Sequence, residues 1–138
     1  MIKNYTKTFL GILLLMLWSC CSQTDAKING VSFVASGDRV TQKNISPVVN
    51  LNANYAAVMP FGYLKSLNHP TVIYDADRQW FGESITGVKQ YITELHKHNV
   101  QVMLKPQIWV SKGEFTGNIS MTSEDDWTEM ESTYEDFI

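Results

Sequence analysis

The sequence contains few cysteines, and they lie at one end. Cys20 and Cys21 are adjacent, and no cysteine follows them. A disulfide framework and a cysteine-ligated metal site are therefore excluded for the chain after Cys21. The histidines offer no replacement, because His96 and His98 are two positions apart on a predicted helix and face different ways. We expect neither a metal nor a cofactor.

Concentrated positive charge is also lacking. The chain has 11 Lys and Arg against 14 Asp and Glu, a net charge of −3, and no basic cluster beyond "HKH" at 96–98. Duplex nucleic-acid binding needs a dense Lys/Arg surface, so we expect no nucleic-acid partner. No glycine-rich phosphate loop supports nucleotide binding either. The acidic residues gather after position 123, which favours a solvated acidic helix face.

The first 20 residues have the pattern of a secretory signal. Two lysines, Lys3 and Lys7, precede an apolar run from Phe9 to Trp18 that is too short to span a bilayer as a helix. The stretch "LWSC" at 17–20 resembles the lipobox of bacterial lipoproteins. That resemblance implies a lipid on Cys20, a tether over 21–27, a folded part over 28–138, and anchoring to the membrane of a bacterial cell envelope on its periplasmic or outer-surface side. The alternative is an ordinary cleaved signal.

Three apolar segments alternate with helical patterns after the tether. The apolar segments 28–35, 55–60 and 100–105 predict strands. Helices are predicted from about Asn44 or Ser46 to Ala53, over 84–98, and after Ser123 to the last residue. The start of the first helix is set by Pro47, which is tolerable only in a first helical turn. Long loops are predicted after Pro60 and after Pro106, which is expected to end strand pairing.

Strand–helix alternation predicts an α/β fold with a parallel sheet. The strands are almost uniformly apolar, as in sheets that are covered on both faces. A (β/α)₈ TIM barrel needs about 250 residues, and the apolar face of the last helix, which includes Met130 and Phe137, has no evident cover. We therefore expect a partial (β/α)₈ TIM barrel, the first three β/α units only. A small doubly wound domain, complete as written, is the alternative.

The run "VMLKPQIWV" at 102–110 places polar and aromatic side chains at the end of a predicted barrel strand. Active-site groups of such barrels lie at the carboxyl ends of the strands. Lys105, Gln107 and Trp109 would give an ammonium, an amide and an indole at this rim, a combination that suits a sugar ring and its hydroxyls. The alternative is that Lys105 extends to solvent and Trp109 packs under the loop.

A longer stretch carries a family resemblance. "RQWFGESITGVKQYITELHKHNVQVMLKPQIWV" at 78–110, followed by "KGEFTGNI" at 112–119, resembles the amino-terminal part of glycoside hydrolase family 113, the β-mannanase-like (β/α)₈ enzymes. "INGVSFVA" and "YAAVMPFGY" fit the first two strands of that pattern. The sequence departs from it at Gln107, where a histidine is expected, and at Phe115, where tryptophan is common.

The resemblance implies retaining glycoside hydrolysis by two carboxylates. These would come from the fourth strand and a late strand, so we expect no catalytic residue in this chain. Glu83 is interpreted as a helix cap or ion-pair partner, and Glu114 as a loop residue. The predicted partner is a plant or microbial polysaccharide or oligosaccharide, bound by Lys105, Gln107, Trp109, Arg78, Trp80 and Phe115, with Tyr63 as a further candidate. A non-catalytic surface glycan-binding lipoprotein is the alternative.

Overall fold

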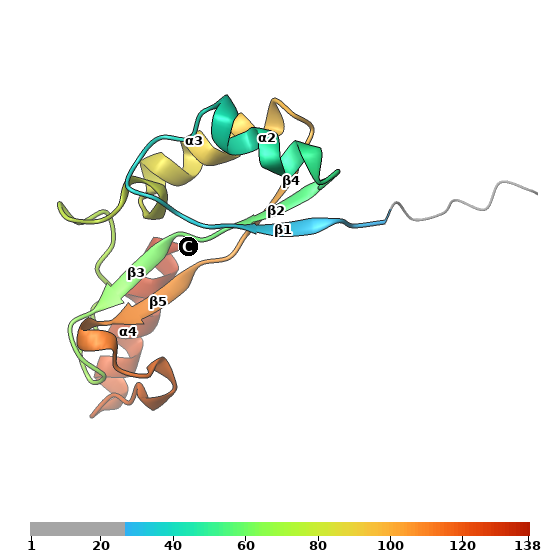
Figure 1. Cartoon of the computed structure of the whole chain (residues 1–138). Helices are drawn as coiled ribbons and strands as arrows, with labels where there is room; N and C mark the ends of the chain where they lie inside the picture. Colours follow the sequence, from blue (N-terminus) through green and yellow to red (C-terminus); the bar gives the residue numbers. More distant parts are fainter. Residues whose placement is uncertain (1–26) are drawn as a thin grey trace, which may run out of the picture.

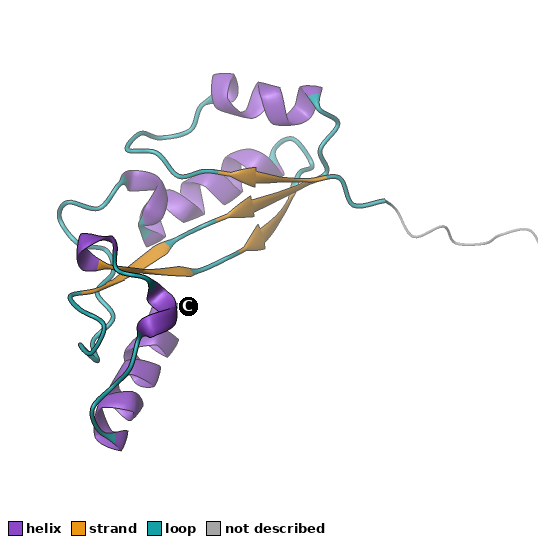
Figure 2. Cartoon of the chain, turned by 60° about the horizontal axis from the view of Figure 1, so that its bottom comes forward, coloured by secondary structure: helices purple, strands orange, loops and turns teal. Residues whose placement is uncertain are grey.

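The computed structural model describes residues 27–138, which form a mixed α/β fold. The prediction of lipid on Cys20 lies outside these residues. Figures 1 and 2 show small parallel sheets with helices packed against them. The strands are β1 (Gly30–Phe33), β2 (Tyr55–Val58), β3 (Phe61–Leu64), β4 (Gln101–Leu104) and β5 (Gln107–Val110). The helices are α2 (Gln42–Asn50), α3 (Ile85–His96) and α4 (Glu124–Phe137), with short 3₁₀ turns η1 (Phe81–Glu83), η2 (Ser111–Gly113) and η3 (Thr116–Asn118).

All strand pairs are parallel, and the two sheets continue one another. The order is β1-β2-β4 in the first sheet and β3-β5 in the second. Val58 pairs with Leu104 before the break and Phe61 pairs with Gln107 after it, a separation of 46 positions in both cases. The register is therefore kept across the gap between the sheets (Figure 1).

The expectation that Pro106 ends strand pairing is wrong. Lys105 N–H donates to Val58 O at 2.9 Å, and Gln107 N–H donates to Pro60 O at 3.0 Å. A proline removes one ladder donor, but it leaves the residue after it free to pair again. Residues 61–64 and 107–110, which were predicted as loop, are consequently strands.

The first core lies between the β1-β2-β4 sheet and the helices α2 and α3, on the side where both helices appear in Figure 1. Ile45 of α2, Ala56 of β2 and Tyr91 of α3 are fully buried there. In the part of the chain that the structure describes, no helix covers the opposite face, where Val34 is 72% and Met103 56% exposed. Helices therefore cover one face of this sheet and leave the other exposed within these residues.

The second core joins α4 to the β3-β5 sheet. Leu64, Val72, Val110 and Phe137 are buried together, and Met130 packs against them. The expectation that the apolar face of α4 has no cover is wrong, because β3 and β5 supply it. Every second residue is buried in both strands: Ala56 and Val58 in β2, then Gly62 and Leu64 in β3. These even-numbered residues share one face of the strands. Helix α4 therefore packs on the same face as α2 and α3.

Helix α2 begins earlier than the sequence predicted. The side-chain carbonyl of Asn44 accepts hydrogen bonds from the backbone N–H and the hydroxyl of Thr41, both at 2.9 Å. These bonds fix Thr41 as the N-cap. Pro47 therefore lies inside the helix rather than in its first turn, and Ser46 donates to Gln42 O at 2.8 Å in the turn before it.

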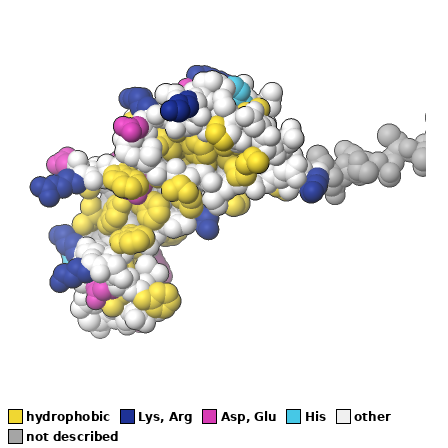
Figure 3. Space-filling view, viewed as in Figure 1, with side chains coloured by type: hydrophobic (Ala, Val, Ile, Leu, Met, Phe, Trp, Pro, Cys, Tyr) yellow, Lys and Arg dark blue, Asp and Glu magenta, His cyan; other side chains and the backbone are white. Residues whose placement is uncertain are grey.

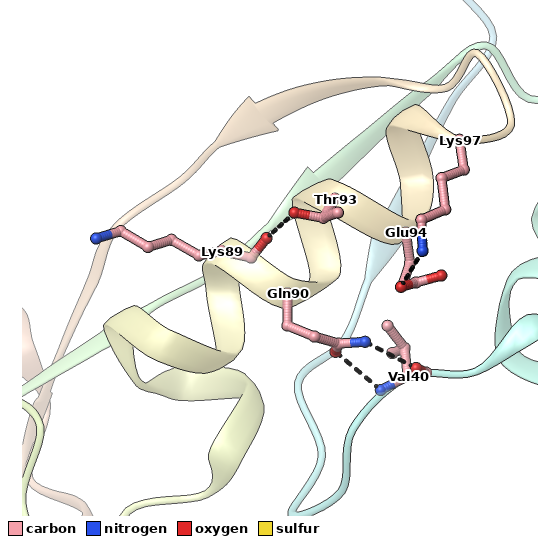
Figure 4. Close-up of polar contacts among 6 residues, drawn as sticks. All are labelled: Val40, Lys89, Gln90, Thr93, Glu94 and Lys97. Carbon is pink, nitrogen blue, oxygen red and sulfur yellow. Dashed lines mark hydrogen bonds and ion pairs between the residues drawn. The ribbon is translucent and has the colours of Figure 1, made fainter.

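Helices α3 and α4 begin and end close to the predicted residues. Ser84 accepts from Gly87 N–H and Ser123 accepts from Asp126 N–H, each as an N-cap. Asn99 follows α3 in the left-handed conformation, with φ of 57°. The side chain of Gln90 fixes α3 to the segment just before α2, because it both donates to Val40 O and accepts from Val40 N–H (Figure 4). Among residues 27–138, no helix is long and apolar enough to cross a membrane.

Candidate functional site

A groove of about 470 Å³ lies on the sheet face that the helices leave uncovered, near the carboxyl ends of β1 and β2. Hydrophobic side chains gather in patches over the middle of the molecule in Figure 3. The groove walls are mainly aromatic and aliphatic, with a single carboxylate; the lining residues are Val34, Ala35, Met59, Phe61, Tyr63, Trp80, Glu83 and Trp109.

Strand alternation places three of the lining residues, Phe61, Tyr63 and Trp109. Phe61 and Tyr63 alternate with the buried residues of β3, so they face away from α4 and into the groove. Trp109 is the register partner of Tyr63 on β5. Its ring centroid lies 6.3 Å from that of Phe61, and its side chain is 52% exposed. The indole is therefore held at one edge of the groove with a free surface.

The long connection after β3 supplies Trp80 and Glu83 to the lining. Ile73 forms a two-way backbone bridge with Tyr63, with both hydrogen bonds at 2.8 Å. Gln79 then donates from Nε2 to Phe61 O at 2.7 Å and to Glu83 O at 3.1 Å. Because these bonds fix the chain on both sides of Trp80, its indole, 57% exposed, is positioned on the groove wall.

Tyr63 and Glu83 form the polar contact inside the groove. The Tyr63 hydroxyl donates to Glu83 Oε2 at 2.6 Å. Burial, the hydrogen bond to Glu83 and the carboxylate charge raise the pKa of Tyr63 far above its ordinary range. The phenol therefore remains a hydrogen-bond donor, and it orients one oxygen of the carboxylate.

The predicted site residues are separated into three groups. Trp80, Trp109 and the further candidate Tyr63 line this groove. Gln107 and Phe115 line a neighbouring groove of about 350 Å³, which shares Trp109 with the first and also contains Glu114. Lys105 and Arg78 are exposed and line neither groove.

Glu83, Phe61, Met59 and Val34 line the groove but were not predicted to do so. Glu83 was interpreted as a cap or ion-pair partner. The N-cap of α3 is Ser84 instead, and Glu83 has no ion pair within residues 27–138. Strand alternation, if extended past Pro60, would have predicted that Phe61 and Tyr63 face the same way. No local sequence pattern predicts the contact between Tyr63 and Glu83.

The described residues contain no group of three or more His, Cys, Asp and Glu side chains that could hold a metal ion. The groove lining offers stacking on aromatic rings together with hydrogen bonding to one carboxylate and one phenol. No protein-family model matches this chain, and no curated protein matches it.

Proposed function

We propose that the protein binds a carbohydrate chain in this groove, as a segment of a retaining, β-mannanase-like glycoside hydrolase with a (β/α)₈ barrel. The supporting observation is that two half-exposed indoles, Trp80 and Trp109, line the same groove as the Tyr63–Glu83 pair. An aromatic face binds the apolar side of a sugar ring, and the phenol and carboxylate bind its hydroxyls.

The strand order supports a barrel over a doubly wound sheet that is complete within residues 27–138. The parallel strands β1, β2 and β4 lie in the order in which they occur in the chain, and α2 and α3 pack on one face. A doubly wound sheet reverses its order at a switch point and carries helices on both faces. A barrel places all its helices outside and its site at the carboxyl ends of the strands, where this groove lies.

A second candidate is a non-catalytic glycan-binding lipoprotein at the bacterial cell envelope. It is favoured by the lining, because Glu83 is the single carboxylate among the described residues of the groove. Retaining hydrolysis uses two carboxyl groups about 5 Å apart. The hydrolase proposal therefore requires strand-terminal glutamates in the reading frame after the codon for Ile138, and the lipoprotein proposal requires none there. Sequencing that frame separates the two.

Affinity electrophoresis of the full chain in gels that contain mannan, xylan or a soluble cellulose derivative tests carbohydrate binding. We expect retardation by at least one polysaccharide, and its loss in Trp109→Ala. Trp127→Ala is the matched control, because Trp127 lies on α4 and lines neither groove. An unretarded chain in every gel would overturn both candidates.

A further inference from the structure

The groove contains a carboxylate without a neighbouring cation, a feature that recognition of a neutral sugar does not require. Glu83 lies among the rings of Phe61, Tyr63, Trp80 and Trp109, and no Lys, Arg or His among residues 27–138 lines the groove. Within residues 27–138 the one ion pair is Lys97–Glu94 at 2.7 Å, which lies on α3 and does not involve Glu83. The carboxylate is therefore not neutralised by a cation of the described part of the chain.

One oxygen of this carboxylate is available to a ligand. Oε2 accepts the Tyr63 hydroxyl at 2.6 Å, and no hydrogen bond within the described residues occupies Oε1. The raised pKa of Tyr63 keeps its hydroxyl protonated, so the phenol adds no second negative charge. The groove thus presents one oriented, negatively charged oxygen between aromatic walls.

Such a lining favours a cation over a neutral group. An ammonium within about 6 Å of an aromatic face is attracted by the ring quadrupole. Its attraction to a carboxylate also increases where apolar walls lower the local dielectric. An acetamide at the same position would gain a hydrogen bond at most, and a sugar carboxylate would be repelled.

We propose that the groove selects a glycan with a free primary amine, a hexosamine unit that is not acetylated, and that Glu83 determines this selection. The inference rests on the proposed function, since it assigns a substrate class to the same groove. The ammonium donates to Glu83 Oε1 while the sugar ring stacks on Trp109 or Trp80.

Calorimetric titration of the full chain with three tetrasaccharides tests the inference. The ligands are a β-1,4-glucosamine tetramer, its fully N-acetylated counterpart and mannotetraose. We expect the free-amine tetramer to bind about tenfold more tightly than the acetylated one, and Glu83→Gln to reduce this ratio below twofold. Glu131→Gln removes the same charge from α4, outside both grooves, and is expected to leave the ratio unchanged. Circular dichroism checks the fold of both variants.

The outcomes separate this inference from the proposed function. Equal binding of the three ligands overturns the selection by Glu83 and leaves carbohydrate binding intact. A preference for the amine that survives Glu83→Gln overturns the inference. A preference that Glu131→Gln also abolishes comes from the net charge of the chain, and this result overturns the inference as well. Binding of none of them overturns both. Should Glu83→Gln fail to fold, Glu83→Asp is expected to reduce the ratio at least threefold, and an unchanged ratio overturns the inference.

Discussion

The hydroxyl of Tyr63 on β3 lies 2.6 Å from the carboxylate of Glu83 in η1, and this hydrogen bond joins the strand to the far end of the long connection. The bond holds a carboxylate in the groove that Trp80 and Trp109 also line. Because the bond also raises the pKa of Tyr63, the pH at which Tyr63 ionises reports whether the bond is formed.

Tyr63 is expected to remain protonated where an ordinary tyrosine ionises. Its pKa is raised by burial first, then by the hydrogen bond and the charge of Glu83. A raised folded-state pKa gives stability that is complete below about pH 10, the unfolded-state pKa, and lost as the pH rises beyond it. Urea unfolding is measured from about pH 8 to about pH 11, a range that includes this value. The free energy of unfolding should fall more steeply with pH for the unsubstituted protein than for Tyr63→Phe. Parallel curves would contradict the assignment.

Gly87 is expected to tolerate no side chain. A Cβ at this buried position in the first turn of α3 would overlap the backbone carbonyl of Phe81. Backbone atoms cannot move aside as a flexible side chain does, so Gly87→Ala should destabilise the protein by about 3 kcal/mol, at the upper end of overpacking effects. Urea denaturation measures the change. Gly37→Ala is the control, because nothing lies within 4 Å of its added Cβ; equal stability of the two variants would exclude this explanation.

The Tyr91 hydroxyl is expected to stabilise the turn that follows β1. It accepts from Ser36 N–H at 3.2 Å, donates to Asp38 O at 3.0 Å, and lies 2.9 Å from Ser36 Oγ. Tyr91→Phe keeps the buried ring but leaves these groups without their partner, at a cost of about 1–3 kcal/mol. Thermal or urea unfolding measures it. Tyr55→Phe, whose hydroxyl has no hydrogen bond within the described residues, should change stability by less than about 0.5 kcal/mol.

The sequence predicted the features that depend on local spacing. The apolar period of α3 and the serine cap at Ser123 place two helices correctly, because these signals act within one or two turns. The α/β class also follows from the alternation of strands and helices.

The features that depend on contacts between distant segments were missed. Pro106 was expected to end its strand, yet Pro60 lies at the same register on the neighbouring strand, and pairing resumes beyond both. The Tyr63–Glu83 pair requires Gln79 to hold η1 against β3. Trp80 and Trp109, which line the groove, were among the predicted site residues, whereas Glu83 was not.

Asp126 is expected to stabilise the start of α4 in a pH-dependent manner. Its carboxylate accepts the Thr122 hydroxyl at 2.6 Å, and hydrogen bonds from Thr122 and Ser123 lower its pKa. A depressed carboxyl pKa gives stability that is present above the unfolded-state pKa of about 4 and lost as the pH falls through the folded-state value. The unchanged chain should therefore be more stable than Asp126→Asn at pH 7, and the difference should vanish at about pH 2. Urea unfolding at both pH values measures this difference, with Asp125→Asn as the control from the same turn. A difference that is as large in acid as at neutral pH would show that the carboxylate charge plays no part.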